Sequence, residues 1–450
     1  MTTIILLLYL ALLIAVAVGS FKKVRDFNDF FVARKSGSYR AVSGSLIATI
    51  LGGSAVIGAI DEGASLGWAS SWYMLTAAIG LAALLPLTGR ISRLGRFTLP
   101  DLLNDLYGRQ SRLIASFIIP IAWTGIVAAQ LIAAASILQS FTGMSYTAGV
   151  WIAALVFIGY TVAGGQLSIL KTDAVQSLLI LAGLVLVAVF SLQLHDMKAI
   201  DYKTPAFPFN SHFKPFDLLI LLFTYATTFT AGPDIYSRIF CAANEQVARR
   251  AIITTIAVLI PVALIIGFLG TTAASLVSES GTQGAVIIEL GKSVLPAWLL
   301  PLIVLSLLSA VLSSADTTLL SASIIIAELF DGKQQPGQKS LKRSRYLIVL
   351  TGFISLLIAL HFHSIIGMLL IALTVYSGAF TLPVLAGLAG IKIKQSMVSA
   401  AIITGGLMAL SGKLISLYSD PFTGKVLIIS AFAVNALLLL AGSKRGNRFR

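Results

Sequence analysis

The chain has 450 residues, of which 57% are hydrophobic and only 11% are charged, and its formal net charge is +14. A soluble domain carries about 25% charged residues, so this composition excludes an ordinary soluble enzyme or nucleic-acid-binding domain. The single cysteine, Cys241, excludes an internal disulfide framework and a cysteine-based metal centre.

About thirteen apolar stretches have the length of a membrane-spanning helix. They predict helices at 2–19, 41–60, 68–88, 113–140, 147–163, 173–194, 216–236, 251–276, 299–323, 346–361, 364–388, 396–418 and 425–442. The first stretch lacks a preceding basic region and a small-residue cleavage site, so we expect a retained helix and not a signal peptide. The predicted fold class is therefore an all-α polytopic membrane protein.

Lysine and arginine are distributed unequally between alternate loops. One set of loops holds 26 of the 32 basic residues, and the other six are Lys198, Lys203, Lys214, Lys292, Lys413 and Lys425. The positive-inside rule places the richer set, which includes Lys171 and Arg238, in the cytoplasm. The amino terminus is then outside the cell membrane and the carboxyl terminus is cytoplasmic, and the net charge needs no nucleic-acid partner.

Two glycines interrupt the second predicted helix, in ATILGGSAVIG (Ala48 to Gly58). Each glycine weakens a helix by roughly 1 kcal/mol, so Gly52 and Gly53 together favour an unwound point. An unwound point in a membrane frees backbone carbonyls for a cation and amides for a substrate. Close packing of helices through small residues explains the same pattern equally well.

An acidic residue, Asp173, begins an apolar run in AGGQLSILKTDAVQS (Ala163 to Ser177). It is either an acid buried in the membrane or an acid at the membrane surface. Its position beside Lys171, taken alone, favours the surface.

A cluster of polar residues lies in LSSADTTLLSAS (Leu312 to Ser323), inside a segment that otherwise predicts a membrane helix. At about 100° per residue, six polar positions share one face of roughly 140°: Ser306, Ser309, Ser313, Asp316, Thr317 and Ser321. Hydrogen bonding between helices accounts for one or two such serines. A carboxylate in the bilayer costs at least about 2.5 kcal/mol, so the full set favours an ion or solute pathway lined by hard oxygen ligands.

Together these segments resemble the sodium:solute symporter family, which holds sodium-coupled transporters of proline, pantothenate, sialic acid and sugars. The resemblance covers nearly the whole chain, and its most specific element is G-G-x(6)-T-D-x-x-Q within YTVAGGQLSILKTDAVQ (Tyr160 to Gln176). Further matches are SLIATILGGSAVIG (Ser45 to Gly58), RISRLGRFTLPDLLNDLYG (Arg90 to Gly108), GPDIYSRIFCAANEQVARRA (Gly232 to Ala251) and LSSADTTLLSAS.

The resemblance implies a LeuT-type fold with two inverted five-helix repeats, at 41–194 and 216–388. An extra amino-terminal helix and a cytoplasmic loop would occupy 1–40, and an extracellular loop 195–215. Two carboxyl-terminal helices and a short cytoplasmic tail would fill 389–450.

The resemblance also implies three groups of site residues. The main sodium site would use carbonyls of Ala48, Leu51 and Ala310 and the hydroxyls of Ser313 and Ser314. A second site, for a cation or a proton, would use Asp173, Asp316 and Thr317, although Asp316 replaces a serine of other members. The substrate site would draw on Gly53, Ser54, Ala55, Gln130, Tyr225, Thr228 and Tyr376. Ser54 and Ala55 offer fewer hydrogen-bonding groups than sugar transporters have there, so we expect a small organic solute and not a sugar.

The implied activity is sodium-coupled symport by alternating access, with Na⁺ as the coupling ion and no obligate protein partner. No H-E-x-x-H or G-x-S-x-G motif is present, so we do not expect an enzyme. Two alternatives stay open. Asp316 or Asp173 could carry a coupled proton on the same fold, or the chain could be a membrane solute sensor that does not transport. The short tail GSKRGNRFR, which holds no output domain, disfavours the sensor.

Overall fold

The computed structural model describes a few positions between residues 9 and 19, and then residues 27–94, 98–193, 207–276, 286–331 and 338–443. This part of the chain consists of helices joined by short loops, with two isolated β-bridges that join Gly37 to Ala242 and Ile393 to Ser443. The first half contains α2 (Phe27–Val32), η1 (Ala33–Lys35), α3 (Tyr39–Ile50), α4 (Gly53–Leu66), η2 (Gly67–Ser71), α5 (Trp72–Leu84), η3 (Leu85–Leu87), α6 (Thr88–Leu94), α7 (Leu99–Tyr107), α8 (Arg109–Thr142) and α9 (Tyr146–Leu192). The second half contains α10 (Pro215–Leu221), η4 (Leu222–Ala226), α11 (Thr227–Ala231), α12 (Pro233–Cys241), α13 (Glu245–Leu276), α14 (Val286–Val294), α15 (Leu300–Asp331), α16 (Gln338–His361), α17 (Ile365–Leu388), α18 (Gln395–Tyr418) and α19 (Pro421–Gly442).

Ten helical stretches of the described chain are long and apolar enough to cross a membrane, which confirms an all-helical membrane protein. The sequence predicted about thirteen spans, and the difference of three has identifiable causes. The predicted span 2–19 lies almost entirely outside the described residues. The predicted spans 41–60 and 68–88 are divided differently, because α3 is only 12 residues long and the apolar stretch restarts at Gly53. The predicted spans 147–163 and 173–194 both fall within α9.

The range labelled α9 consists of two helical segments that meet at Gly165, so both predicted spans are helical, and Lys171 lies on the second segment and not in a loop. Only Gly165 departs from helical geometry, at φ 54° and ψ −161°, and it kinks the helix. Positive φ suits glycine, and a Cβ at this position would also lie 2.5 Å from the ring of Phe30. Gly165 therefore separates two helical segments, which agree with the two predicted spans, and a kink takes the place of the predicted loop.

Two other helices are broken inside the bundle. The first break separates α3 from α4 at Leu51 and Gly52, within the glycine-rich segment that predicted it. The second separates α11 from α12 at Gly232, which has an extended ψ of 137° and precedes Pro233. Proline lacks an amide hydrogen and favours the first turn of a new helix, so the Gly-Pro pair ends α11 and starts α12.

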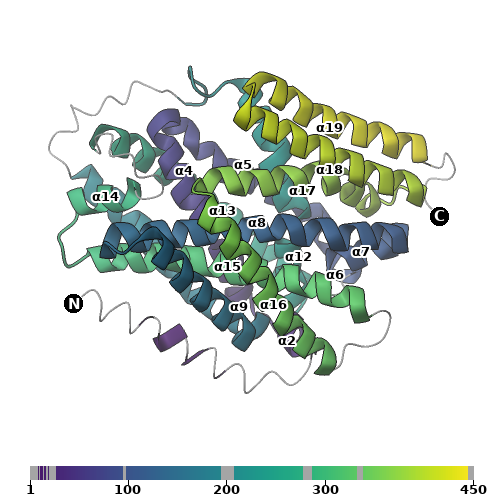
Figure 1. Ribbon diagram of the computed structural model, residues 1–450, viewed down its shortest axis with the longest axis horizontal. Coiled ribbons are helices and arrows are strands. Elements are labelled where there is room, and N and C mark those ends of the chain that lie inside the picture. Colours follow the sequence, from purple (N-terminus) through teal and green to yellow (C-terminus); the bar gives the residue numbers. More distant parts are fainter. Residues whose placement is uncertain are drawn as a thin grey trace.

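The helix α15 lies at the centre of the molecule, where it packs against α3, α4, α8, α9 and α16. In its most apolar stretch 89% of the residues are buried. The face opposite the polar cluster, which includes Val311, Ala315 and Leu319, is also buried, so α15 contacts protein and not lipid on both faces. The helices α18 and α19 pack against each other along one edge of the bundle (yellow in Figure 1), away from this centre.

Candidate functional site

The break between α3 and α4 exposes backbone carbonyls, and α15 supplies hydroxyls to them. A helix that ends leaves its last carbonyl oxygens without amide partners. The Ser313 hydroxyl oxygen lies 2.9 Å from the carbonyl oxygen of Ala48, and the Ser314 hydroxyl donates to the carbonyl of Thr49 at 2.8 Å. Both serines are buried, so the broken end of α3 is completed by α15.

These oxygen atoms have the chemistry of a small monovalent cation site. The Ser313 hydroxyl also lies 3.1 Å from the carbonyl oxygen of Ala310, so three of the five predicted sodium ligands converge. Leu51, another of the five, is the fully buried residue that follows α3 at the break. Carbonyl and hydroxyl oxygens are hard donors without net charge, which suits the single charge of Na⁺.

A buried arginine joins the residues of the second predicted site. The Arg238 guanidinium lies 3.3 Å from the carboxylate of Asp173, and neither side chain is exposed. Arg238 also donates to the hydroxyl of Thr317 and, from its other nitrogens, to Ser45 at 3.0 Å and Ser237 at 2.9 Å. Arg238 therefore lies in the last turn of α12 and not in a loop between spans, and Asp173 is the buried acid of the two alternatives.

Asp316 lies beside this pair but is not neutralised by it. Its Oδ1 atom is 3.4 Å from the Thr317 hydroxyl. Its Oδ2 atom, like Oδ1 of Asp173, has no hydrogen-bond partner within the described part of the chain. The structure thus brings Asp173, Asp316 and Thr317 together. Arg238 forms an ion pair with Asp173 and donates a hydrogen bond to Thr317.

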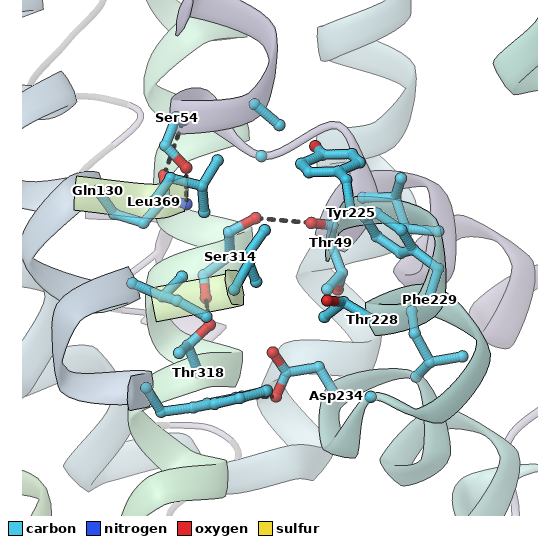
Figure 2. A pocket seen from close by; sticks show the side chains of 18 residues that line it. Thr49, Ser54, Gln130, Tyr225, Thr228, Phe229, Asp234, Ser314, Thr318 and Leu369 are labelled. Carbon is cyan, nitrogen blue, oxygen red and sulfur yellow. Dashed lines mark hydrogen bonds between the residues drawn. The ribbon is translucent and has the colours of Figure 1, made fainter. Parts of the chain in front are cut away.

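A cavity lies directly beside the break. Five of the seven predicted substrate residues line it: Ser54, Ala55, Gln130, Tyr225 and Thr228. Thr49 and Ser314, which form the hydrogen bond across the break, line it too. Figure 2 shows Ser54 and Gln130 at one end of the cavity, Asp234 at the other end, and Ser314 and Thr49 between them.

Gly53 and Tyr376 are not among the lining residues, for physical reasons. Gly53 faces α15 so closely that a Cβ on it would lie 2.0 Å from Cγ2 of Val311. Tyr376 is fully buried, and its hydroxyl donates to the carbonyl of Ala231, which the second helix break leaves free. Both residues therefore lie behind the residues that line the cavity.

Gln130 fixes one end of the cavity. Its amide oxygen accepts from the backbone amide of Ser54 at 3.1 Å, and its amide nitrogen donates to the Ser54 hydroxyl at 2.7 Å. Gln130 comes from α8, so these two bonds tie the start of α4 to a helix that is unbroken.

Several cavity residues were missed by the sequence reasoning: Thr49, Trp123, Phe229, Asp234 and Thr318. Tyr225 lies in η4, a single π-helical turn, a rare irregularity that is frequent at functional sites. The available signal for Asp234 was the sequence Ala-Gly-Pro-Asp at 231–234, because paired helix breaks in the two halves of a chain indicate a binding site in transporters.

Known proteins are similar to this chain in sequence and in fold. The model of the sodium:solute symporter family matches residues 30–405. A sodium/proline symporter of Salmonella typhimurium is 23% identical, over 90% of this chain and 86% of its own length. A sodium/pantothenate symporter of Escherichia coli is 25% identical, over 98% of this chain and 96% of its own length.

Solved structures agree on the fold. A Na⁺-coupled sialic acid symporter in a substrate-bound, outward-open state superimposes with a TM-score of 0.82 over 99% of both chains, at 20% identity. Mhp1, a nucleobase-cation-symport-1 family transporter, gives a TM-score of 0.59 over 92% of this chain and 93% of its own, at 15% identity. These likenesses support the LeuT-type fold that the motifs imply. The chain belongs to the sodium:solute symporter family, and it is a multi-pass membrane protein that acts as a sodium-coupled solute symporter and not as an enzyme.

Proposed function

We propose that sodium binds where α15 meets the broken end of α3, with Ala48, Leu51, Ala310, Ser313 and Ser314 as its ligands. The observation that carries this proposal is the contact of Ser313 and Ser314 with the freed carbonyls of Ala48 and Thr49. A sodium ion between these groups would hold α3 and α15 together at the one place where α3 has no helical continuation.

The solute binds in the adjacent cavity, next to Ser54, Gln130, Tyr225 and Thr228. Ser314 and Thr49 both line this cavity and meet each other across the break. An ion that orders the break therefore also orders the wall of the solute site, so each ligand raises the affinity for the other. The names of the relatives, which are proline and pantothenate symporters, support a small organic solute.

Transport then follows from alternating access. The two halves, 41–194 and 216–388, act as inverted repeats that move relative to each other around the central site, with the amino terminus outside and the carboxyl terminus in the cytoplasm. A membrane potential of about 100 mV adds roughly 2.3 kcal/mol for each charge that enters with the solute. The sodium gradient and the membrane potential together drive uptake of the solute from outside the cell.

One observation favours a second coupling group, Asp316. Its Oδ2 atom is buried without a hydrogen-bond partner among the described residues, and the nearby positive charge of Arg238 is held by Asp173. An unpaired buried carboxylate is costly, so Asp316 takes up a proton or a second cation. Asp173 and Thr317, the other residues of this predicted site, already bind Arg238. We therefore favour a proton on Asp316 over a second cation.

Uptake into liposomes that contain the purified protein tests this function. Labelled proline and labelled pantothenate are supplied under an inward gradient of sodium, of potassium or of protons alone. Uptake of a labelled solute that requires the sodium gradient supports the proposal. Equal uptake under the proton gradient without sodium would show that Asp316 or Asp173, and not the serine pair, carries the coupling ion.

A further inference from the structure

We infer that the transported solute carries a cationic nitrogen and that Asp234 is the residue that binds it. The inference rests on the proposed function in one respect: the solute must occupy the cavity beside the helix break. It adds the chemical class of the solute and a residue that selects it.

Asp234 gives the cavity a negative charge. Among the residues that line the cavity within the described chain, it is the only charged side chain, and none is lysine, arginine or histidine. Figure 2 shows its carboxylate at the end of the cavity opposite Ser54 and Gln130. A solute that is only an anion would meet this carboxylate with no positive side chain in the wall to offset the repulsion.

The nearest cation does not cancel this charge. Arg238 follows Asp234 by one turn of α12, but its donors contact Ser45, Thr49, Ser237, Asp173 and Thr317. The partner that the structure gives the Asp234 carboxylate is the indole N–H of Trp123, which donates to Oδ1 at 2.9 Å. This neutral group orients the carboxylate and supplies no positive charge to it.

Negatively charged side chains also outnumber positively charged ones near the cavity. The described residues here include three carboxylates, Asp173, Asp234 and Asp316, and one guanidinium, that of Arg238. Arg238 is paired with Asp173, so neither Asp316 nor Asp234 forms an ion pair with a residue that the structure describes. An unpaired charge at membrane depth is costly and indicates a ligand or a proton. Only Asp234 of the two lines the solute cavity, so its partner enters with the solute.

The rest of the wall suits an organic cation. Trp123, Tyr225 and Phe229 line the cavity together with Asp234. Aromatic faces attract ammonium groups, most strongly where water is displaced. At the far end, Ser54 and Gln130 offer uncharged donors and acceptors, which fit a neutral or carboxylate end of a zwitterion.

Asp234 also lies in the first turn of α12, where an acidic side chain stabilises a helix whatever the cavity holds. The test must therefore separate binding from helix stability. Stabilisation by sodium alone reports that a variant is folded, because the sodium ligands lie on α3 and α15 and not on α12.

The experiment measures thermal stability of the purified protein against matched solutes, in sodium and in potassium. The pairs differ in the cationic nitrogen: L-proline with cyclopentanecarboxylate, and β-alanine with propionate. The panel adds other amino acids, amines, quaternary ammonium and guanidinium compounds, and pantothenate and glucose as solutes without such a nitrogen. The proteins are the wild type, Asp234→Asn, the charge-retaining Asp234→Glu, and Asp61→Asn, which removes a carboxylate from a different cavity.

We expect stabilisation only by solutes with a cationic nitrogen. Asp234→Asn should raise the Kd of those solutes about 10- to 100-fold, the range for a lost hydrogen bond to a charged group. Asp234→Glu should recover part of the affinity, and Asp61→Asn should retain it. The inference is overturned if Asp234→Asn binds like the wild type, if pantothenate or glucose stabilises, or if sodium stabilises and no cationic solute does. Cationic solutes that bind equally in potassium would instead refute sodium coupling and leave the inference intact.

Discussion

Ser314 and Thr49 lie 265 positions apart and meet at the wall of the solute cavity, where the Ser314 hydroxyl donates to the Thr49 carbonyl at 2.8 Å. The bond closes the end of α3 from a helix in the other half of the chain. Any movement of α15 relative to α3 must break or remake it. This pair is therefore the most direct structural link between the sodium ligands and the solute site.

Replacement of Ser314 by alanine should weaken both ligands together. The Thr49 carbonyl would lose its partner, a loss of about 1–3 kcal/mol for a buried group. Sodium activation of uptake should shift to higher sodium concentrations, and solute affinity should fall with it. The matched control is Ser323→Ala, because Ser323 is buried on the same helix but donates only to its own Leu319 carbonyl, at 2.7 Å. An unaltered sodium dependence in Ser314→Ala, with the control also unaltered, would argue against this link.

A methyl group at Gly53 should disturb the break from behind. The added Cβ would lie 2.0 Å from Cγ2 of Val311, so Gly53→Ala should destabilise by about 1–3 kcal/mol and reduce uptake. The double variant Gly53→Ala with Val311→Ala removes the nearest clashing atom, so it should recover part of the lost stability and part of the lost uptake. Both quantities are measured, as thermal stability and as uptake rate, for the single and the double variant. If Gly53→Ala is as stable and active as the wild type, α4 and α15 are not packed as described.

The ion pair of Arg238 and Asp173 should behave as one unit. Removal of one partner from a buried pair costs about 3–5 kcal/mol, because the other charge is left alone. Arg238→Met and Asp173→Asn should each destabilise strongly, and the double variant should be more stable than the sum of the two losses predicts. Denaturation of all four proteins completes the cycle. Additive losses would mean that the two side chains do not depend on each other.

Asp316→Asn should separate proton from sodium effects. The variant keeps Ser313 and Ser314, so uptake should still require sodium. If Asp316 takes up a proton during the cycle, wild-type uptake will vary with pH more steeply than uptake by the variant. Initial rates at saturating sodium, from mildly acidic to mildly basic buffer, provide the comparison. Equal pH profiles in the two proteins would remove Asp316 from the coupling mechanism.

The sequence was informative where the chemistry is local. Two glycines in an apolar run weaken a helix at that point, and the break indeed lies at Leu51 and Gly52. Likewise, six polar residues on one helix face require burial, and the structure buries them. Such patterns can be predicted because neighbours in the chain determine helix propensity and face.

Features that depend on distant residues could not be predicted from the same patterns. Arg238 looked like a loop residue because basic residues usually flank membrane helices, but its partner Asp173 lies 65 positions away and pairs with it inside the protein. The segment around Lys171 looked like a loop because it is polar, whereas the lysine is an exposed residue on the helical segment of α9 that follows the kink at Gly165. Tyr376 looked like a cavity residue, but its hydroxyl is taken by the free Ala231 carbonyl.

Equilibrium binding of radioactive sodium to the purified protein tests the central claim most directly, with the wild type, Ser313→Ala and the control Ser323→Ala compared in a potassium background. The account predicts that the wild type and Ser323→Ala bind sodium, and that Ser313→Ala binds it about tenfold or more weakly, as expected for a lost ligand of a charged group. Equal sodium affinity in all three folded proteins would contradict a sodium site at the junction of α3 and α15.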